Sequence, residues 1–218
     1  MLLIHKGTEP PSLTAYRKTS FAYYDGCNKD DIRQNLLQEQ GFLCAYCMRR
    51  IDARHMKIEH WRPEHLLSES EKLDYGNMLG VCMGHMEGQP GKSDTCDAKK
   101  GEQVISVNPC VPEHIQSIFY EKGTGIIRST DSEIASDLDD SLNLNCEQQW
   151  LPANRRAALQ RVIEELSKRR RSGTWKKTDI QKMLRFYETP DAQGKLREYA
   201  GIILWYLRRK GQGNFGGF

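Results

Sequence analysis

No apolar run in this chain of 218 residues approaches the roughly 18 residues that a membrane-spanning helix needs. The amino-terminal residues also lack the charged region, apolar stretch and small-residue cleavage site that mark a secretory signal. Internal repeats and long low-complexity tracts are absent as well. Charged residues make up 28% of the chain and the mean hydropathy is −0.69, so we expect a cytoplasmic protein with no membrane contact. A chain of this length can form one sizeable domain or two small ones.

Charge is distributed unevenly along the chain. Residues 150–218 carry ten more basic than acidic residues, whereas residues 1–149 carry seven more acidic than basic ones. The basic carboxyl-terminal part is therefore suited to contact a polyanion or a partner protein. An equally open interpretation is that its helices simply have solvated lysine and arginine faces.

Seven cysteines form an odd set, and in a reducing cytosol paired cysteines are more typical of zinc ligands than of disulfides. Cys44 and Cys47 form a C-x2-C turn, and Cys82 and Cys96 supply a second pair. Zn²⁺ prefers four soft ligands in a closed tetrahedron, with Zn–S distances of about 2.3 Å. The spacing therefore predicts a structural zinc that stabilises a small fold, with four free buried cysteines as the alternative.

The second cysteine pair is stretched, because thirteen residues separate Cys82 from Cys96. His85 follows Cys82 by three residues and offers a Cys3His site without Cys96. We favour Cys96 as the fourth ligand, since the charged residues that complete the motif follow it directly.

Hydrophobic periodicity predicts a helix over residues 30–40, after an irregular arm over 1–28. A short strand is expected over 56–60, and a second strand, or the loop into a helix, over 77–81. Beyond the motif the pattern predicts a strand over 104–108 and a hairpin formed by 115–120 and 124–127. It also predicts three helices. The first runs from about 153 to 168, the second begins after an N-cap at Thr178, and the third ends at about Arg209.

Phosphodiester hydrolysis needs an activated water and neutralisation of the phosphate charge. His60 can take a proton from water near neutral pH. Glu59 and Asp97 are hard oxygen ligands suited to Mg²⁺ or Mn²⁺, and the side-chain amide of Asn77 can fix the loop opposite His60. The residues suited to hold phosphate oxygens are Arg62, Lys99 and Lys100.

Each of these residues also has an ordinary interpretation when it is taken alone. Glu59 and His60 fit a surface acid beside a satisfied histidine, Asn77 fits a turn, and residues 99–100 fit a solvated face. Their joint order, bracketed by four cysteines, favours the catalytic interpretation.

The runs C-x2-C, E-H-x2-P, N-x-L-x2-C and C-D-x2-K-G resemble the core of the HNH, or ββα-metal, endonucleases. With the periodicity, the resemblance implies an α+β fold: a zinc-braced ββα-metal core, an amino-terminal helix and a mainly helical carboxyl-terminal region. It implies that His60 is the general base, that Glu59 and Asp97 bind the catalytic Mg²⁺ or Mn²⁺, and that Asn77 is the middle, structural asparagine. Glu59 stands where aspartate is usual, and Asp97 where asparagine or histidine is usual.

A narrower resemblance covers roughly residues 30–168. The run L-L-x-E-Q-G-x-L-C-A-Y-C, the N-P at Asn108, the L-N-L-N from Leu142 and Arg155 are similar to the HNH subunits of Septu and retron anti-phage systems, called PtuB. This implies a toxic effector that acts with a PtuA-type ABC/SMC-like ATPase. In retron versions, a reverse transcriptase and its RNA-linked DNA complete the assembly.

We therefore expect an amino-terminal arm over 1–29, a nuclease core over 30–110, and a basic, mostly helical partner-docking region over 111–218. The expected substrate is DNA in the first place, with tRNA or other RNA left open. The alternative is a non-catalytic, zinc-braced nucleic-acid-binding or adaptor subunit. An adaptor needs the cysteines but not Glu59, His60, Asn77 and Asp97, so the presence of these four polar residues favours the nuclease.

Overall fold

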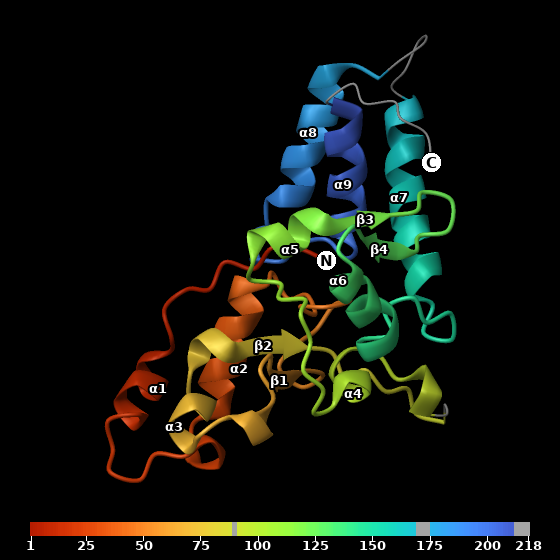
Figure 1. Cartoon of the computed structure of the whole chain (residues 1–218). Helices are drawn as coiled ribbons and strands as arrows, with labels where there is room; N and C mark the ends of the chain where they lie inside the picture. Colours follow the sequence, from red (N-terminus) through yellow and green to blue (C-terminus); the bar gives the residue numbers. More distant parts are fainter. Residues whose placement is uncertain (89–90, 169–174, 212–218) are drawn as a thin grey trace.

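The computed structural model describes residues 1–88, 91–168 and 175–211, and it combines helices with two small antiparallel sheets. Figure 1 shows β1, β2 and α2 at one end of the molecule and α7, α8 and α9 at the other, with β3 and β4 between them. In chain order the helices are α1 (Pro11–Tyr16), α2 (Lys29–Glu39), α3 (Glu69–Lys72), α4 (Cys96–Lys100), α5 (Pro112–Ser117), α6 (Ser132–Ser136), α7 (Leu151–Lys168), α8 (Lys177–Glu188) and α9 (Ala200–Gly211). The strands are β1 (Lys57–His60), β2 (Met78–Val81), β3 (Ile118–Tyr120) and β4 (Ile127–Ser129). The predicted mixture of helices and strands is confirmed.

The amino-terminal segment is not wholly irregular, which corrects the expectation for residues 1–28. Pro11 begins α1, where its missing backbone N–H leaves no helical hydrogen bond unmade. Met1, Ile4 and Leu13 are buried, and the backbone N–H of Ile4 donates to the carbonyl of Pro109 at 2.9 Å. Long-range packing therefore orders a segment whose local pattern is weak.

The helix predicted before the first cysteine pair is confirmed as α2. Asn28 caps it, because the side-chain oxygen of Asn28 accepts hydrogen bonds from the backbone N–H groups of Asp30 and Asp31 at 3.0 and 3.4 Å. The buried face of α2 consists of Ile32, Leu36 and Leu37.

Gln40, directly after α2, ties the helix to the first cysteine turn and to β2. Its Nε2 donates to the carbonyls of Leu43 at 2.8 Å and Gly80 at 2.7 Å, and its Oε1 accepts from the backbone N–H of Gly80 at 2.7 Å. This buried amide is fully paired, as buried polar groups need to be. Because Leu43 precedes Cys44 and Gly80 lies near Cys82, Gln40 brings two cysteine-bearing segments together.

The central sheet pairs β1 with β2 in antiparallel register, with Lys57 opposite Val81 and His60 opposite Met78. Both predicted strands are confirmed. All residues of β2 are buried, and α2 packs against this strand. The short helix α3 lies between the two strands in the chain, and the helix α4 follows β2.

The strand predicted over 104–108 is wrong. The backbone N–H groups of Ser106 and Val107 both donate to Asp137 Oδ2, at 2.6 and 2.9 Å, so a distant side chain takes the donors that a sheet would use. The predicted hairpin is confirmed with shifted limits, since residues 112–117 form α5 and the paired strands are β3 and β4.

The predicted helix after Pro152 is confirmed as α7, and α8 and α9 pack against each other. Thr178 is not an N-cap, because α8 has Lys176 at that position and already includes Thr178. The last predicted helix is confirmed as α9, which begins at Ala200. Asp191 Oδ1 accepts the backbone N–H groups of Gln193 at 2.9 Å and Lys195 at 2.8 Å, which turns the chain before α9 starts.

Among the described residues, no helix combines the length and the apolar character that crossing a bilayer requires. Residues 169–174 and 212–218 of the predicted carboxyl-terminal region lie outside the described ranges.

Candidate metal and catalytic centre

Four cysteines from separate parts of the chain meet in the interior. The sulfur atoms of Cys44, Cys47, Cys82 and Cys96 all lie within 4.8 Å of one another, and all four residues are buried. The Sγ–Sγ distances are 3.8 Å between Cys44 and Cys96 and 3.7 Å between Cys47 and Cys82. A tetrahedron with Zn–S bonds of about 2.3 Å has edges of about 3.8 Å. The four-cysteine cluster therefore has the dimensions of a closed zinc site and can hold the ion.

The chain between Cys82 and Cys96 turns back on itself at Gly84. The carbonyl of Gly84 accepts hydrogen bonds from the backbone N–H of Thr95 at 2.9 Å and from Gln149 Nε2 at 3.1 Å. Gly84 has a φ of 69°, and a Cβ there would collide with the carbonyl oxygen of Thr95. A glycine is therefore needed to close the stretched spacing.

Cys96 is also held in place by a segment that follows much later in the chain. It has a left-handed φ of 53°, uncommon for a residue with a side chain, and its N–H donates to the carbonyl of Leu142 at 2.9 Å. Asn143 Nδ2 donates to the carbonyl of Asp94 at 2.9 Å, so the L-N-L-N run holds the insertion in place. His85, the alternative ligand, instead places Nδ1 2.7 Å from Asp94 Oδ1 and is half exposed. The geometry favours Cys96.

Two carboxylates approach each other from β1 and α4, each beside a lysine. Lys100 Nζ lies 2.7 Å from Glu59 Oε1, and Lys57 Nζ lies 2.8 Å from Asp97 Oδ2. The hydroxyl of Tyr46 donates to Glu59 Oε1 at 3.3 Å. Glu59 and Lys100 are buried, and Asp97 is partly exposed. We refer to Lys57, Glu59, Asp97 and Lys100 as the carboxylate–lysine cluster.

Burial governs the protonation of this cluster. Desolvation and a hydrogen bond with Asp97 raise the pKa of Glu59 to about 8, and the Lys100 ammonium offsets only part of this shift. Burial pushes the pKa of Asp97 upward too, but the hydrogen bond with Glu59 and the Lys57 ammonium hold it below its usual value. The ammonium of Lys100 alone therefore does not return the pKa of Glu59 to its ordinary value.

His60, at the end of β1, points away from Glu59, as successive side chains of a strand do. Its Nε2 lies 2.8 Å from the carbonyl of Lys72, and because a carbonyl only accepts, this nitrogen carries the proton. Nδ1 is then the nitrogen that can take up a proton. It is buried and lies 3.1 Å from Glu64 Oε1 without hydrogen-bond geometry, while the ring of Tyr24 packs edge-on with its centroid at 4.6 Å. The structure thus orients His60 but does not place it against the carboxylates.

Asn77 braces the turn that follows His60. Its Oδ1 accepts the backbone N–H of Arg62 at 2.8 Å, and its Nδ2 donates to the carbonyl of the same residue at 3.1 Å. The carbonyl of Asn77 accepts the N–H of Trp61 at 2.9 Å. These three bonds hold the end of β1 against the start of β2, which is the kind of contact that the sequence leads us to expect of Asn77.

The three residues predicted to hold phosphate differ in their surroundings. The Arg62 side chain is half exposed and lies 3.5 Å from the carboxylate of Glu71, and Lys99 is partly exposed. Lys100, in contrast, is buried in the carboxylate–lysine cluster. Arg62 and Lys99 can therefore reach a polyanion in this structure, whereas Lys100 faces the interior.

Two residues of the centre are missed by sequence analysis. Lys57 precedes Glu59 by two positions on a strand, and the period of two would have placed both on one face. Tyr46 lies inside the C-x2-C turn, and nothing in the pattern indicates that its hydroxyl reaches Glu59.

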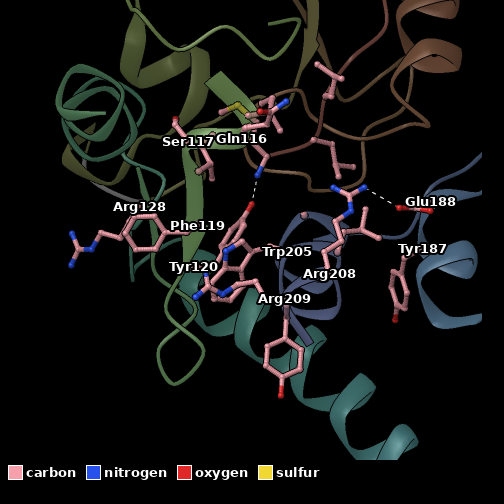
Figure 2. Close-up of a pocket in the computed structure, with 18 of the residues that line it drawn as sticks. Gln116, Ser117, Phe119, Tyr120, Arg128, Tyr187, Glu188, Trp205, Arg208 and Arg209 are labelled. Carbon is pink, nitrogen blue, oxygen red and sulfur yellow. Dashed lines mark hydrogen bonds and ion pairs between the residues drawn. The ribbon is translucent and has the colours of Figure 1, made fainter. Parts of the chain in front are cut away.

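A separate cavity of about 1610 Å³ lies beside β3, α9 and the amino-terminal residues. Phe119 and Trp205 line it, and Arg209 lies over the Trp205 ring at 5.5 Å (Figure 2). Arg208 forms an ion pair of 2.9 Å with Glu188 there. The residues that line this cavity include no member of the four-cysteine or carboxylate–lysine cluster, so it is distinct from the candidate centre.

No protein-family model matches the chain. The chain is similar to a protein of Vibrio cholerae serotype O1 biovar El Tor that is named as the proposed HNH endonuclease of retron Vc95, with 28% identity over 86 residues. The match spans 38% of this chain and 40% of that protein, which is less than half of the length of either. This similarity supports the HNH nuclease family.

Proposed function

We propose that the protein is an HNH-type endonuclease that hydrolyses phosphodiester bonds in nucleic acid. The observation that carries this proposal is the meeting of Glu59 from β1 with Asp97 from α4, the helix that follows the paired strands β1 and β2, beside four clustered cysteines. The similarity to the retron Vc95 protein supports the same class.

The zinc ion of this proposal is structural. Cys44, Cys47, Cys82 and Cys96 would fill all positions of a tetrahedral ion, which leaves no open position for substrate. Its binding would join the first cysteine turn, the end of β2 and the start of α4.

Glu59 and Asp97 are the residues that would hold a catalytic Mg²⁺ or Mn²⁺. They fit such an ion in their chemistry, since both offer carboxylate oxygens and the two are close enough to share a hydrogen bond. Such an ion, when bound, supplies charge neutralisation at the phosphate.

His60 is proposed as the general base. The carbonyl of Lys72 holds its Nε2–H, so Nδ1 takes the proton of the attacking water. Glu64 faces this nitrogen and has to move aside to admit the water. Arg62 and Lys99 bind phosphate oxygens, while Asn77 keeps the turn after His60 in position.

We further propose that the nuclease is the toxic effector of a retron- or Septu-type anti-phage complex with a PtuA-type ATPase, and in a retron with the reverse transcriptase and its RNA-linked DNA. The retron name of the similar protein supports this context. The basic carboxyl-terminal region is proposed as the docking region, with DNA as the first substrate. Co-purification of the tagged chain with the neighbouring gene products tests the partnership.

Cleavage tests the activity. The zinc-loaded protein, alone and with its partner ATPase, is incubated with Mg²⁺ or Mn²⁺ and plasmid DNA, single-stranded DNA and cellular RNA. Cleavage that depends on the ion and is lost in His60→Ala supports the nuclease and identifies its substrate. If a folded protein with its partner cleaves none of these substrates, the non-catalytic adaptor is favoured instead.

A further inference from the structure

Lys100 is among the most deeply buried charged residues of the chain. Its side chain is 1% exposed, and that of its partner Glu59 is 6% exposed. The ammonium also lies 3.2 Å from the carbonyl of His60, so it bridges α4 and β1 through two oxygens. Burying an ammonium is costly unless several acceptors surround it. The fold therefore builds a cation position in front of Glu59 and occupies it with its own lysine.

A second lysine completes the arrangement on the neighbouring carboxylate. Lys57 Nζ lies 2.8 Å from Asp97 Oδ2, with its side chain 43% exposed. Each of the two carboxylates that would hold a divalent ion thus already has an ammonium partner. Like charges that compete for one pair of carboxylates repel each other strongly in a buried site. The more exposed Lys57 can move into solvent, whereas Lys100 is enclosed.

We infer that Lys100 is the resident cation of the Glu59 carboxylate, and that a divalent ion binds there only by displacing its ammonium. The inference rests on the proposed function, since it concerns the ion that such a nuclease uses. Displacement would release the ammonium toward phosphate, which reconciles the burial of Lys100 with its predicted role in phosphate binding. Substrate phosphate and divalent ion would therefore bind cooperatively, because phosphate stabilises the displaced lysine.

The first experiment measures Mn²⁺ binding to the full-length, zinc-loaded protein by the EPR signal of the free ion. Lys100→Gln is expected to bind Mn²⁺ more tightly than wild type, on the order of tenfold or more, because one competing charge is removed. Lys6→Gln is the matched control, since Lys6 forms a similar partly buried ion pair of 2.9 Å with Glu39, outside the cluster. Glu59→Gln identifies the site by losing the binding. Equal or weaker binding by Lys100→Gln would overturn the inference.

The second experiment uses wild type and does not depend on the folding of a variant. Lysines are acetylated briefly with and without saturating Mn²⁺, and the modified positions are identified by mass spectrometry. Lys100 is expected to be protected without the ion and to become reactive with it, while Lys6 is unchanged. A Lys100 that stays protected at saturating Mn²⁺ overturns the inference.

The two proposals fail in different ways. If Lys100 stays protected but Mn²⁺-dependent cleavage is lost in Glu59→Gln, the nuclease stands and the displacement is wrong. If Mn²⁺ exposes Lys100 but the protein with its partner cleaves no substrate, the displacement stands and the nuclease is wrong.

Discussion

The hydroxyl of Tyr46 donates a hydrogen bond of 3.3 Å to the carboxylate of Glu59. Tyr46 is fully buried between Cys44 and Cys47, so one side chain joins the four-cysteine cluster to the carboxylate–lysine cluster. Asp97 provides a second connection, because it directly follows Cys96 in α4. The two clusters are therefore one continuous structure, and a disturbance of the cysteines should be felt at the carboxylates.

Removing one cysteine of the cluster should remove zinc and much of the stability. Cys44→Ser is expected to lower the zinc content from about one ion per chain to none and to reduce the melting temperature sharply, because zinc binding is coupled to folding. Elemental analysis and thermal unfolding measure both effects. Cys110→Ser, outside the cluster, is the control and should keep its zinc. A stable Cys44→Ser protein with full activity would refute the structural zinc.

Replacing the proposed base should affect the rate far more than the fold. His60→Ala is expected to lower kcat by roughly 10²- to 10⁴-fold, the usual contribution of a general base, with zinc content unchanged. His55→Ala is the control, because His55 is exposed and forms an ion pair with Asp52, outside the candidate centre. If His60→Ala cleaves as fast as wild type, another group takes the proton. If it loses zinc or unfolds, His60 is a structural residue.

The two hydrogen bonds between the Asn77 side chain and the backbone of Arg62 should contribute to the stability of the fold. Asn77→Ala loses both side-chain bonds to Arg62 and should lower the free energy of unfolding by about 1–2 kcal/mol. Asn77→Asp keeps the acceptor for the Arg62 N–H but places a carboxylate oxygen against the Arg62 carbonyl, so it should also be less stable than wild type. Urea unfolding measures the two variants against wild type. If both variants are as stable as wild type, the two bonds do not hold this turn.

Glu59 predicts a specific dependence of stability on pH. Its pKa is about 8 in the folded chain, against an ordinary value of 4.5, so folding favours the protonated carboxyl. The stability it contributes is present in full below about pH 4.5 and is lost as the pH rises through about 8. The free energy of unfolding of wild type minus that of Glu59→Gln should therefore fall across this window, without added Mg²⁺ or Mn²⁺. A difference that stays level or rises with pH would mean that Glu59 is ionised in the fold.

Replacing Arg155 by lysine should lower the stability of the fold. It is fully buried, and its guanidinium donates to the carbonyl of Gly125 at 2.7 Å, the carbonyl of Leu144 at 2.8 Å and Asn145 Oδ1 at 2.9 Å. A lysine has no planar fork to serve three acceptors, so Arg155→Lys should cost about 2–4 kcal/mol of stability. Arg156→Lys, at the exposed neighbouring position, should change stability little. Chemical denaturation of the two variants side by side makes the comparison, and equal stabilities would contradict this role.

Elements that depend on local signals were predictable from the sequence. An N-terminal polar residue and a regular apolar face indicate α2, and short apolar runs indicate β1 and β2. Elements that depend on contacts with distant residues were not predictable from the sequence. The strand expected over 104–108 is absent because Asp137, some thirty residues away, binds its backbone, and α1 is ordered by packing of the amino-terminal segment.

The candidate centre divides in the same way. The residue types and their order, from Cys44 to Lys100, are legible in the sequence and indicate a chemistry of thiolates, carboxylates and a histidine. Their orientation is not legible. Glu59 and His60 point to opposite sides of β1. Lys100 packs on the side of Glu59, and the carbonyl of Lys72 lies on the side of His60.

By itself, then, the sequence determined the ligand types, their spacing and the elements that carry them, because these depend on residue chemistry and on local periodicity. Only the tertiary structure decided that Cys96 joins Cys44, Cys47 and Cys82 across a long insertion, and that the buried Lys100 pairs with Glu59. Both outcomes result from contacts between segments far apart in the chain, and the spacing of residues along the chain does not fix the distances between such segments.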